Sequence, residues 1–112
     1  MDWKNLTSPD QLDEIDVLSR SQGVLIYKHS TRCHICTMAL GRIERSWGED
    51  DYTKMRPYFL DVLKNRETSE AVARRYGVEH QSPQVLVISN GACVHHQSHS
   101  SISYSEVMSF AG

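Results

Sequence analysis

Cys33 and Cys36 lie between an apolar run and a segment that favours helix, and this order constrains the fold more than any other feature of the sequence. The apolar run, residues 24–27, predicts a buried strand, and residues 37–47 predict a helix. The two thiols therefore fall where a strand gives way to a helix, three residues apart and close enough to form a disulfide. Unpaired N–H groups and the positive dipole end at a helix start favour thiolate over thiol. The pattern indicates a redox-active pair at a strand–helix junction.

Two other interpretations of this cysteine pair are open on spacing alone. The pair can form half of a structural zinc site, or it can supply two small core residues. Cys93, His95 and His96 add residue types that bind zinc later in the chain. Their spacing matches no standard zinc finger, and strand alternation would turn His95 and His96 to opposite faces. We therefore expect no metal site.

The length and charge of the chain argue against several classes of protein. Its 112 residues fit one domain over 1–112, and the net charge of −2 comes from mixed signs, without the basic face of a nucleic-acid binder. No apolar run approaches the roughly 20 residues of a membrane span, and the N-terminus lacks the basic-then-apolar pattern of a secretion signal. We expect a cytoplasmic protein without nucleic-acid or membrane partners. Three cysteines cannot all pair within the chain, which favours reactive or free thiols.

Apolar periodicity predicts that helices and strands alternate in the order αβαβαββα. Strands separated by helices imply parallel crossovers, whereas Asn90-Gly91 predicts a hairpin and an antiparallel edge strand. The chain is therefore expected to form a four-stranded mixed sheet with helices on both faces, an α/β fold. In the helix after the cysteines, Met38, Ile43 and Trp47 are expected to face inward. The expected helices cover 9–18, 37–47, 65 or 68 to 76, and 103–110, and the expected strands cover 23–29, 57–62, 84–88 and 92–96.

Two helix starts carry capping signals. Ser8 and Gln11 have the spacing of a capping box at the start of the first helix. Ser103 and Glu106 repeat this spacing at the start of the last helix. Each box is expected to satisfy N–H groups in the first turn of its helix.

Three features of the sequence match proteins of the thioredoxin fold. They are Cys33-x-x-Cys36 after the first core strand, Gly77-Val78 at the end of a helix, and Ser82-Pro83 before the third strand. The chain resembles thioredoxin-fold proteins over essentially its whole length. The resemblance implies a thioredoxin-like fold with a cis-proline at Pro83 that faces the active-site cysteine. It also implies that the Ser82 backbone is free to pair with an incoming substrate strand.

The chain resembles the monothiol bacilliredoxins more narrowly, because three motifs agree in order and spacing. Residues 29–36 correspond to a His-Ser-Thr-x-Cys-Pro-Ile-Ser motif, residues 78–84 to Val-x-His-x-Ser-Pro-Gln, and residues 98–102 to Ser-His-x-x-Ile. Two positions depart from the first motif, with His34 in place of its proline and Cys36 in place of its last serine. The resemblance implies a thiol–disulfide oxidoreductase that removes bacillithiol from S-thiolated client proteins. Bacillithiol or a similar low-molecular-weight thiol is then the co-substrate, and no organic cofactor is needed.

The roles of the site residues follow from this resemblance and from their chemistry. Cys33 is the candidate nucleophile, with Arg32 and His34 as neighbouring groups that can carry positive charge. Cys36 is either the resolving thiol of a dithiol route or a simple replacement for the serine of the family. Arg32 is also a candidate for binding the carboxylates of the malate group of bacillithiol, with a solvated loop charge as the alternative. The expected substrate-binding residues are Thr31, Arg32, His34, Ser82 and Pro83.

Two other functions are open. The first is a general dithiol reductase of the thioredoxin or glutaredoxin type, which requires a stable Cys33–Cys36 disulfide. The second is a non-catalytic thioredoxin-fold module that binds a partner in the groove near Pro83. Cys93 is expected to be a small core or edge residue, with a resolving or regulatory thiol as the alternative.

Overall fold

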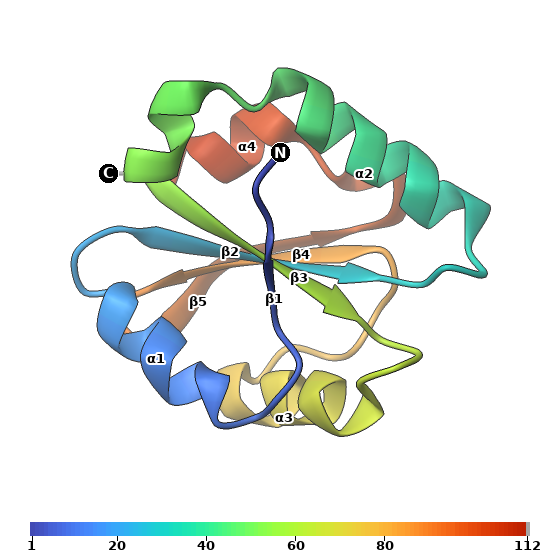
Figure 1. Cartoon of the computed structure of the whole chain (residues 1–112), viewed down its shortest axis with the longest axis horizontal. Helices are drawn as coiled ribbons and strands as arrows, with labels where there is room; N and C mark the ends of the chain where they lie inside the picture. Colours follow the sequence, from blue (N-terminus) through green and yellow to red (C-terminus); the bar gives the residue numbers. More distant parts are fainter. Residues whose placement is uncertain (112) are drawn as a thin grey trace.

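Strand β2 (Gly23–His29) lies at the centre of the sheet, as its apolar run predicts, and all seven of its residues are buried. The computed structural model describes residues 1–111 and arranges five strands in the order β1-β3-β2-β4-β5. Figure 1 shows α2 and α4 on one face of this sheet and α1 and α3 on the other. The other elements are β1 (Lys4–Asn5), α1 (Gln11–Leu18), α2 (His34–Ser46), the 3-10 helix η1 (Glu49–Thr53), β3 (Met55–Asp61), α3 (Arg66–Tyr76), β4 (Gln84–Ser89), β5 (Ala92–Ser98), the 3-10 helix η2 (His99–Ser101) and α4 (Tyr104–Met108).

The direction of β4 differs from the expected parallel crossover. Strands β2 and β3 run parallel, but β4 runs antiparallel to β2, with Lys28 opposite Gln84. Helix α3 and the loop after it return the chain to the end of the sheet at which β3 finished, and His80 in that loop lies against Ser69 in the first half of α3. A chain that re-enters a sheet at the end it left must run antiparallel to the strand it left. The prediction of a parallel strand here is therefore wrong.

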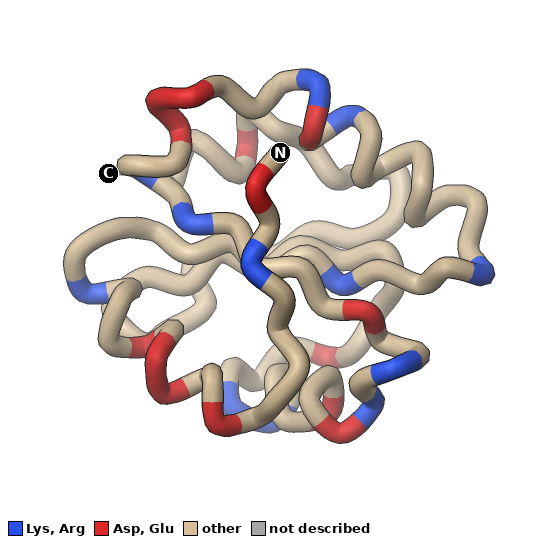
Figure 2. The backbone as a smooth tube through the Cα atoms, viewed as in Figure 1, with Lys and Arg blue, Asp and Glu red and all other residues tan. Residues whose placement is uncertain are grey.

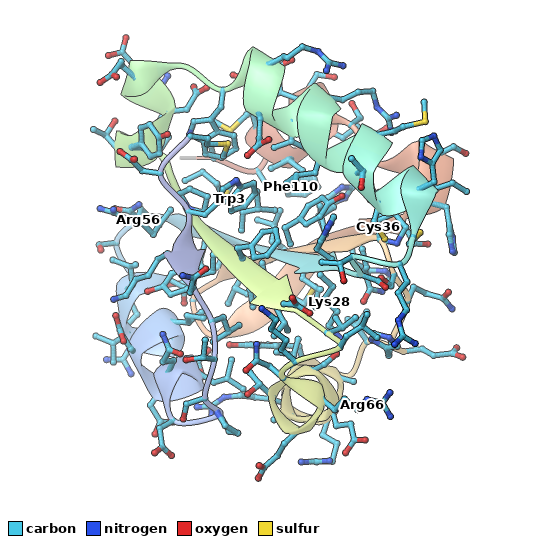
Figure 3. The ribbon with its side chains drawn as sticks, turned by 45° about the vertical axis from the view of Figure 1, so that its right-hand side comes forward. Trp3, Lys28, Cys36, Arg56, Arg66 and Phe110 are labelled. Carbon is cyan, nitrogen blue, oxygen red and sulfur yellow. The ribbon has the colours of Figure 1, made fainter. Side chains whose placement is uncertain are left out.

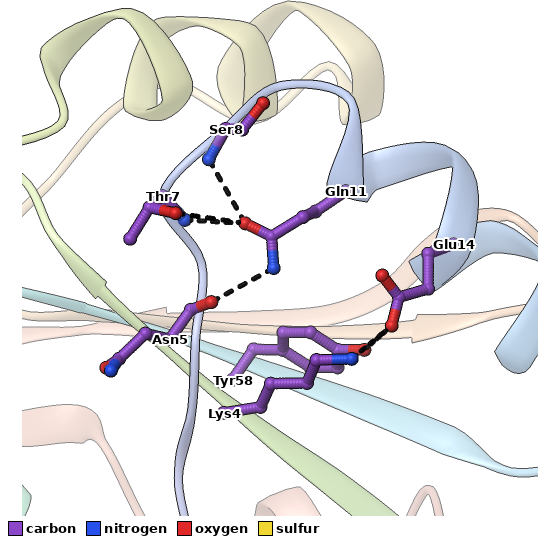
Figure 4. Close-up of polar contacts among 7 residues, drawn as sticks. All are labelled: Lys4, Asn5, Thr7, Ser8, Gln11, Glu14 and Tyr58. Carbon is purple, nitrogen blue, oxygen red and sulfur yellow. Dashed lines mark hydrogen bonds and ion pairs between the residues drawn. The ribbon is translucent and has the colours of Figure 1, made fainter.

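The fifth strand, β1, is an addition to the four strands expected from the sequence. Lys4 and Asn5 pair with Tyr58 and Phe59 of β3 in parallel register. Both residues are exposed and polar, so neither alternation nor apolar content marks them as a strand. Lys4 also forms an ion pair with Glu14 of α1 (Figure 4). Tertiary contacts, and not local propensity, give this segment its extended form.

Gln11 ties β1 to the start of α1 (Figure 4). Its Oε1 accepts hydrogen bonds from the N–H groups of Thr7 (2.7 Å) and Ser8 (3.1 Å), and its Nε2 donates to Asn5 O (3.0 Å). The glutamine half of the expected capping box is thus confirmed. The serine half differs, because Ser8 Oγ accepts from Asp10 N–H (3.3 Å) and α1 begins later than expected, at Gln11.

Two separate apolar layers cover the faces of the sheet. On one side, Ile26 and Leu86 pack with Leu12 and Ile15 of α1 and with Val72 of α3. Because neighbouring strand residues point to opposite faces, one continuous apolar run serves both layers. The second layer joins the sheet to α2 and α4 and contains Leu25, Tyr27, Ala39, Ile43, Met55, Val85, Val87, Ile102 and Val107.

The inward face of α2 differs in part from the expected one. Cys36, Ala39 and Ile43 are buried, but Met38 is 54% exposed. Residues 36, 39 and 43 recur at the helical period, whereas residue 38 is turned about 100° from residue 39. The expectation that Ile43 faces inward is confirmed, and the one for Met38 is wrong.

The C-terminal elements follow their local sequence signals. Asn90 and Gly91 have φ values of 50° and 74°, the left-handed pair that a tight hairpin requires, and β5 returns antiparallel to β4. Ser103 Oγ accepts a hydrogen bond from Glu106 N–H at the start of α4. The hairpin and the serine cap are both confirmed.

The surface carries charges of both signs. Figure 2 shows Lys and Arg positions interspersed with Asp and Glu positions over the backbone, with acidic runs along α1 and η1. Within residues 1–111, no helix is long and apolar enough to cross a membrane.

Candidate active site

Cys33 caps the N-terminus of α2, because the helix begins at His34 and not at residue 37 as expected. Its backbone is extended (φ −107°, ψ 113°), and its Sγ accepts a hydrogen bond from Cys36 N–H at 3.3 Å. The sulfur therefore takes the place that a serine or aspartate oxygen takes at an ordinary N-cap. Cys33 is half-buried and lies at the positive end of the helix dipole, where negative charge is stabilised.

The two thiols of the motif differ in acidity. Hydrogen bonds from the Cys36 thiol and from the Cys36 backbone N–H hold the pKa of Cys33 below its usual value. Burial raises the pKa of Cys36, whose side chain is inaccessible to solvent. Cys33 thus has the properties of a nucleophile, and Cys36 those of a protected second thiol.

Hydrogen bonds, and not the neighbouring cations considered from the sequence, lower the pKa of Cys33. Thr31, Arg32 and His34 are exposed. Among the residues that the structure describes, their side chains form no hydrogen bond or ion pair. These three residues flank Cys33 as groups that an incoming molecule can contact.

Cys36 is held by two segments that are distant from each other in sequence. Its carbonyl accepts a hydrogen bond from the Tyr27 hydroxyl of β2 at 2.8 Å, and its Sγ lies 3.3 Å from Oγ of Ser82 in the loop before β4. The Ser82–Pro83 peptide bond is cis, and Pro83 is buried. The structure thus places Cys33 and Ser82 on either side of Cys36, with Pro83 next to Ser82 in the chain.

A buried polar cluster behind this loop was not predicted from the sequence. Lys28 of β2 is fully buried, and its Nζ donates to Ser69 O (3.2 Å) and lies 3.2 Å from Nδ1 of His80. Ser69 Oγ also lies 3.2 Å from the same nitrogen. Figure 3 shows Lys28 between the sheet and α3, while Cys36 lies at the start of α2. The available signal was a lysine inside an otherwise apolar strand, and burial lowers the pKa of this lysine to about 8.

Cys93 lies apart from this site. It pairs with Ile88 near the far end of β4, whereas Ser82 precedes the near end. Its Sγ donates to His95 O at 3.3 Å, and burial raises the pKa of this half-buried thiol. Over residues 1–111, no group of three or more His, Cys, Asp or Glu side chains is arranged to hold a metal ion.

Comparison with known proteins agrees with this geometry. A family model described as monothiol bacilliredoxin BrxC matches residues 4–107. A solved structure described as a candidate oxidoreductase with a thioredoxin fold is 30% identical, with a TM-score of 0.80, and the match covers 95% of this chain and 90% of that one. Two thioredoxins share the fold, one from Malassezia sympodialis (17% identity, TM-score 0.73, covering 96% of this chain and 86% of that one) and one from Fasciola hepatica (16%, 0.70, 95% and 93%). The chain therefore has the thioredoxin fold and belongs to the monothiol bacilliredoxin family.

Proposed function

We propose that this protein is a thiol–disulfide oxidoreductase that removes bacillithiol from S-bacillithiolated client proteins of the cytoplasm. One observation carries the proposal: the half-buried Cys33 sulfur caps a helix, accepts the Cys36 N–H, and has a lowered pKa. A thiolate stabilised in this way is a nucleophile for disulfides. Membership in the bacilliredoxin family supports bacillithiol as the thiol that is removed.

The reaction begins at Cys33. Its thiolate attacks the bacillithiol sulfur of the client mixed disulfide, and the client leaves as a thiolate that takes a proton from water. Bacillithiol is then bonded through a disulfide to Cys33. Cys36 next attacks the Cys33 sulfur, a Cys33–Cys36 disulfide forms, and bacillithiol leaves as its thiolate. A low-molecular-weight thiol or a reductase supplies the two electrons that return the pair to dithiols.

The groups around Cys33 can contact both halves of the proposed substrate, the client peptide and the carboxylate-bearing bacillithiol. The loop that contains Ser82 faces Cys36 and leads through Pro83 into β4. We propose that the Ser82 backbone pairs there with an extended client segment. Thr31, Arg32 and His34 are exposed beside the nucleophile. We propose Arg32 as the cation that attracts the malate carboxylates of bacillithiol.

Intact-mass analysis under non-reducing conditions tests the proposal. Reduced wild-type protein is mixed with a client that carries one bacillithiol, and Cys33→Ser and Cys36→Ala are treated in parallel. We expect the wild type to free the client and to finish as an internal disulfide. Cys36→Ala stops as a bacillithiol adduct on Cys33, and Cys33→Ser leaves the client capped.

Two results of the same experiment would contradict the proposed function. A client that keeps its cap in the presence of the wild type refutes the bacillithiol reaction. Release of the cap by Cys33→Ser at the wild-type rate refutes Cys33 as the nucleophile. A client capped with glutathione serves as the matched control for the identity of the thiol.

A general dithiol reductase is the second candidate, because Cys36 supplies the second thiol that such a reaction needs. This candidate predicts that glutathione-capped and bacillithiol-capped clients are released at equal rates. It also predicts rapid reduction of the internal disulfide by a flavoprotein thioredoxin reductase.

A further inference from the structure

The Cys36 sulfur is closed off from solvent, and a single side-chain oxygen lies beside it. Cys36 is fully buried, and Ser82 Oγ is 3.3 Å from its Sγ. The Tyr27 hydroxyl donates to the Cys36 carbonyl at 2.8 Å, and among the described residues it forms no hydrogen bond with the Cys36 sulfur. Within residues 1–111, no carboxylate or imidazole lies within hydrogen-bond distance of this sulfur.

This arrangement leaves one step of the proposed reaction without a base. Cys36 attacks as a thiolate, so the buried thiol must first lose its proton. A buried charge is strongly disfavoured unless hydrogen bonds stabilise it, and the groups that do so for the Cys36 thiolate are the Ser82 side chain and, to a smaller extent, the Ser30 backbone. Ser82 can accept the proton of the thiol and can then donate a hydrogen bond to the thiolate, because its hydroxyl is both an acceptor and a donor. Its side chain is only half-buried, so it can also exchange a proton with water.

We propose that the Ser82 hydroxyl takes the proton of Cys36 while passing its own proton to water, and then donates a hydrogen bond to the thiolate that attacks Cys33. This inference rests on the resolving role of Cys36 in the proposed function. In the step, the Cys36 S–H bond breaks and the Cys36–Cys33 disulfide bond forms. The bond from Cys33 to the outgoing sulfur breaks, and the leaving thiolate keeps the electron pair and takes a proton from solvent.

The geometry assigns Ser82 to the second half of the reaction. Its hydroxyl contacts the sulfur of Cys36, whereas the Cys33 sulfur is held by the Cys36 backbone N–H. Ser82 therefore governs how fast a mixed disulfide on Cys33 is resolved, relative to how fast it forms.

A small aromatic disulfide, 5,5′-dithiobis(2-nitrobenzoic acid), separates the two halves without any client or bacillithiol. One equivalent is mixed with reduced protein in a Cys93→Ala background, which removes the third thiol. Attack by Cys33 releases a first coloured thiolate, and resolution by Cys36 releases a second. The readout is the ratio of the second rate constant to the first within each variant.

We expect Ser82→Ala to lower this ratio about tenfold, the factor expected from losing one hydrogen bond to a charged group. Ser82→Thr keeps a hydroxyl and retains the ratio within about threefold. In the mixed disulfide Cys33 no longer titrates, so the pH dependence of the second phase reports on Cys36. Its midpoint moves up by about one pH unit in Ser82→Ala and stays in place in Ser82→Thr.

An unchanged ratio and midpoint in Ser82→Ala overturn the inference, as does a Ser82→Thr variant that behaves like Ser82→Ala. Absence of a second phase in the wild type also overturns it, while leaving Cys33 as the nucleophile. Failure of the proposed function is a separate result, because it appears as a missing first phase or as a client that keeps its bacillithiol. The melting temperature of each variant shows that the comparison is made between folded proteins.

Discussion

The buried lysine of β2 makes stability depend on pH in a way that Lys28→Met can isolate. Lys28 is fully buried, and its ammonium group bonds to Ser69 O and to His80 Nδ1. Among the described residues, no carboxylate lies within ion-pair distance of it. Burial therefore lowers its pKa from 10.5 to about 8.

The sign and size of the effect follow from these two pKa values. Between about pH 8 and pH 10.5, the unfolded chain keeps a proton on this lysine that the folded protein has lost. The free energy of unfolding therefore rises with pH across this window, and below it the protein carries the full cost of the buried charge. Each pKa unit corresponds to about 1.36 kcal/mol, so the complete rise is about 3 kcal/mol.

Urea unfolding between about pH 7 and pH 10.5, with a reductant present, measures this rise in the wild type and in Lys28→Met. Methionine fills a similar volume without a titrating group. Its loss of hydrogen bonds to Ser69 and His80 costs about 1–3 kcal/mol, but this cost is constant over the window. We expect the wild type to gain about 3 kcal/mol relative to Lys28→Met between the two ends.

Subtraction of the two pH curves removes the contributions of the shared groups whose pKa values do not depend on Lys28. Lys28 also lowers the pKa of His80, but an imidazole titrates at about pH 6.5, below the window. Lys64→Met, which removes an exposed lysine, is the matched control, and its curve is expected to follow that of the wild type. Parallel curves for the wild type and Lys28→Met would refute the reasoning, because they would mean that Lys28 keeps its proton in the folded state as it does in water.

Three further changes test the site and the core. Cys36→Ala removes the thiol that hydrogen-bonds to Cys33, so the pKa of Cys33 rises, and the ultraviolet absorbance of its thiolate appears at higher pH. Tyr27→Phe deletes the hydroxyl that binds the Cys36 carbonyl and lowers the free energy of unfolding by about 1 kcal/mol in urea titrations. Ile43→Ala leaves a cavity between α2 and the sheet and lowers the free energy of unfolding by about 2–5 kcal/mol in the same assay. A loss below about 1 kcal/mol would mean that the surrounding side chains fill the cavity.

Local chemistry made much of the fold predictable. Gly77 ends α3 with a left-handed φ of 66°, and Asn90 and Gly91 form the hairpin because their backbones tolerate positive φ. The redox pair could also be predicted from the sequence, since a strand, two cysteines and a helix follow one another along the chain.

The features that the sequence did not predict depend on contacts between distant segments. The direction of β4 is set by the return of the loop after α3, and β1 exists through its pairing with β3. Lys28 meets Ser69 and His80 only after the sheet and α3 have come together. Ser82 was expected at the site for its backbone, and the structure adds the contact of its hydroxyl with Cys36.

Pro57 and the short strand β1 together decide where this sheet can grow. Leu6 N–H donates to Phe59 O, so Phe59, and Pro57 two residues earlier, direct their backbone groups away from β2. The missing N–H of Pro57 therefore falls on the outer side of β3, just before the two positions that β1 covers. A strand from another chain could therefore not pair fully with this edge, because Pro57 offers no N–H there and β1 already pairs with the next two residues. Backbone pairing with another chain is therefore favoured at the opposite edge of the sheet, along β5. A fusion partner should be attached so that β5 does not pair with strands of other molecules.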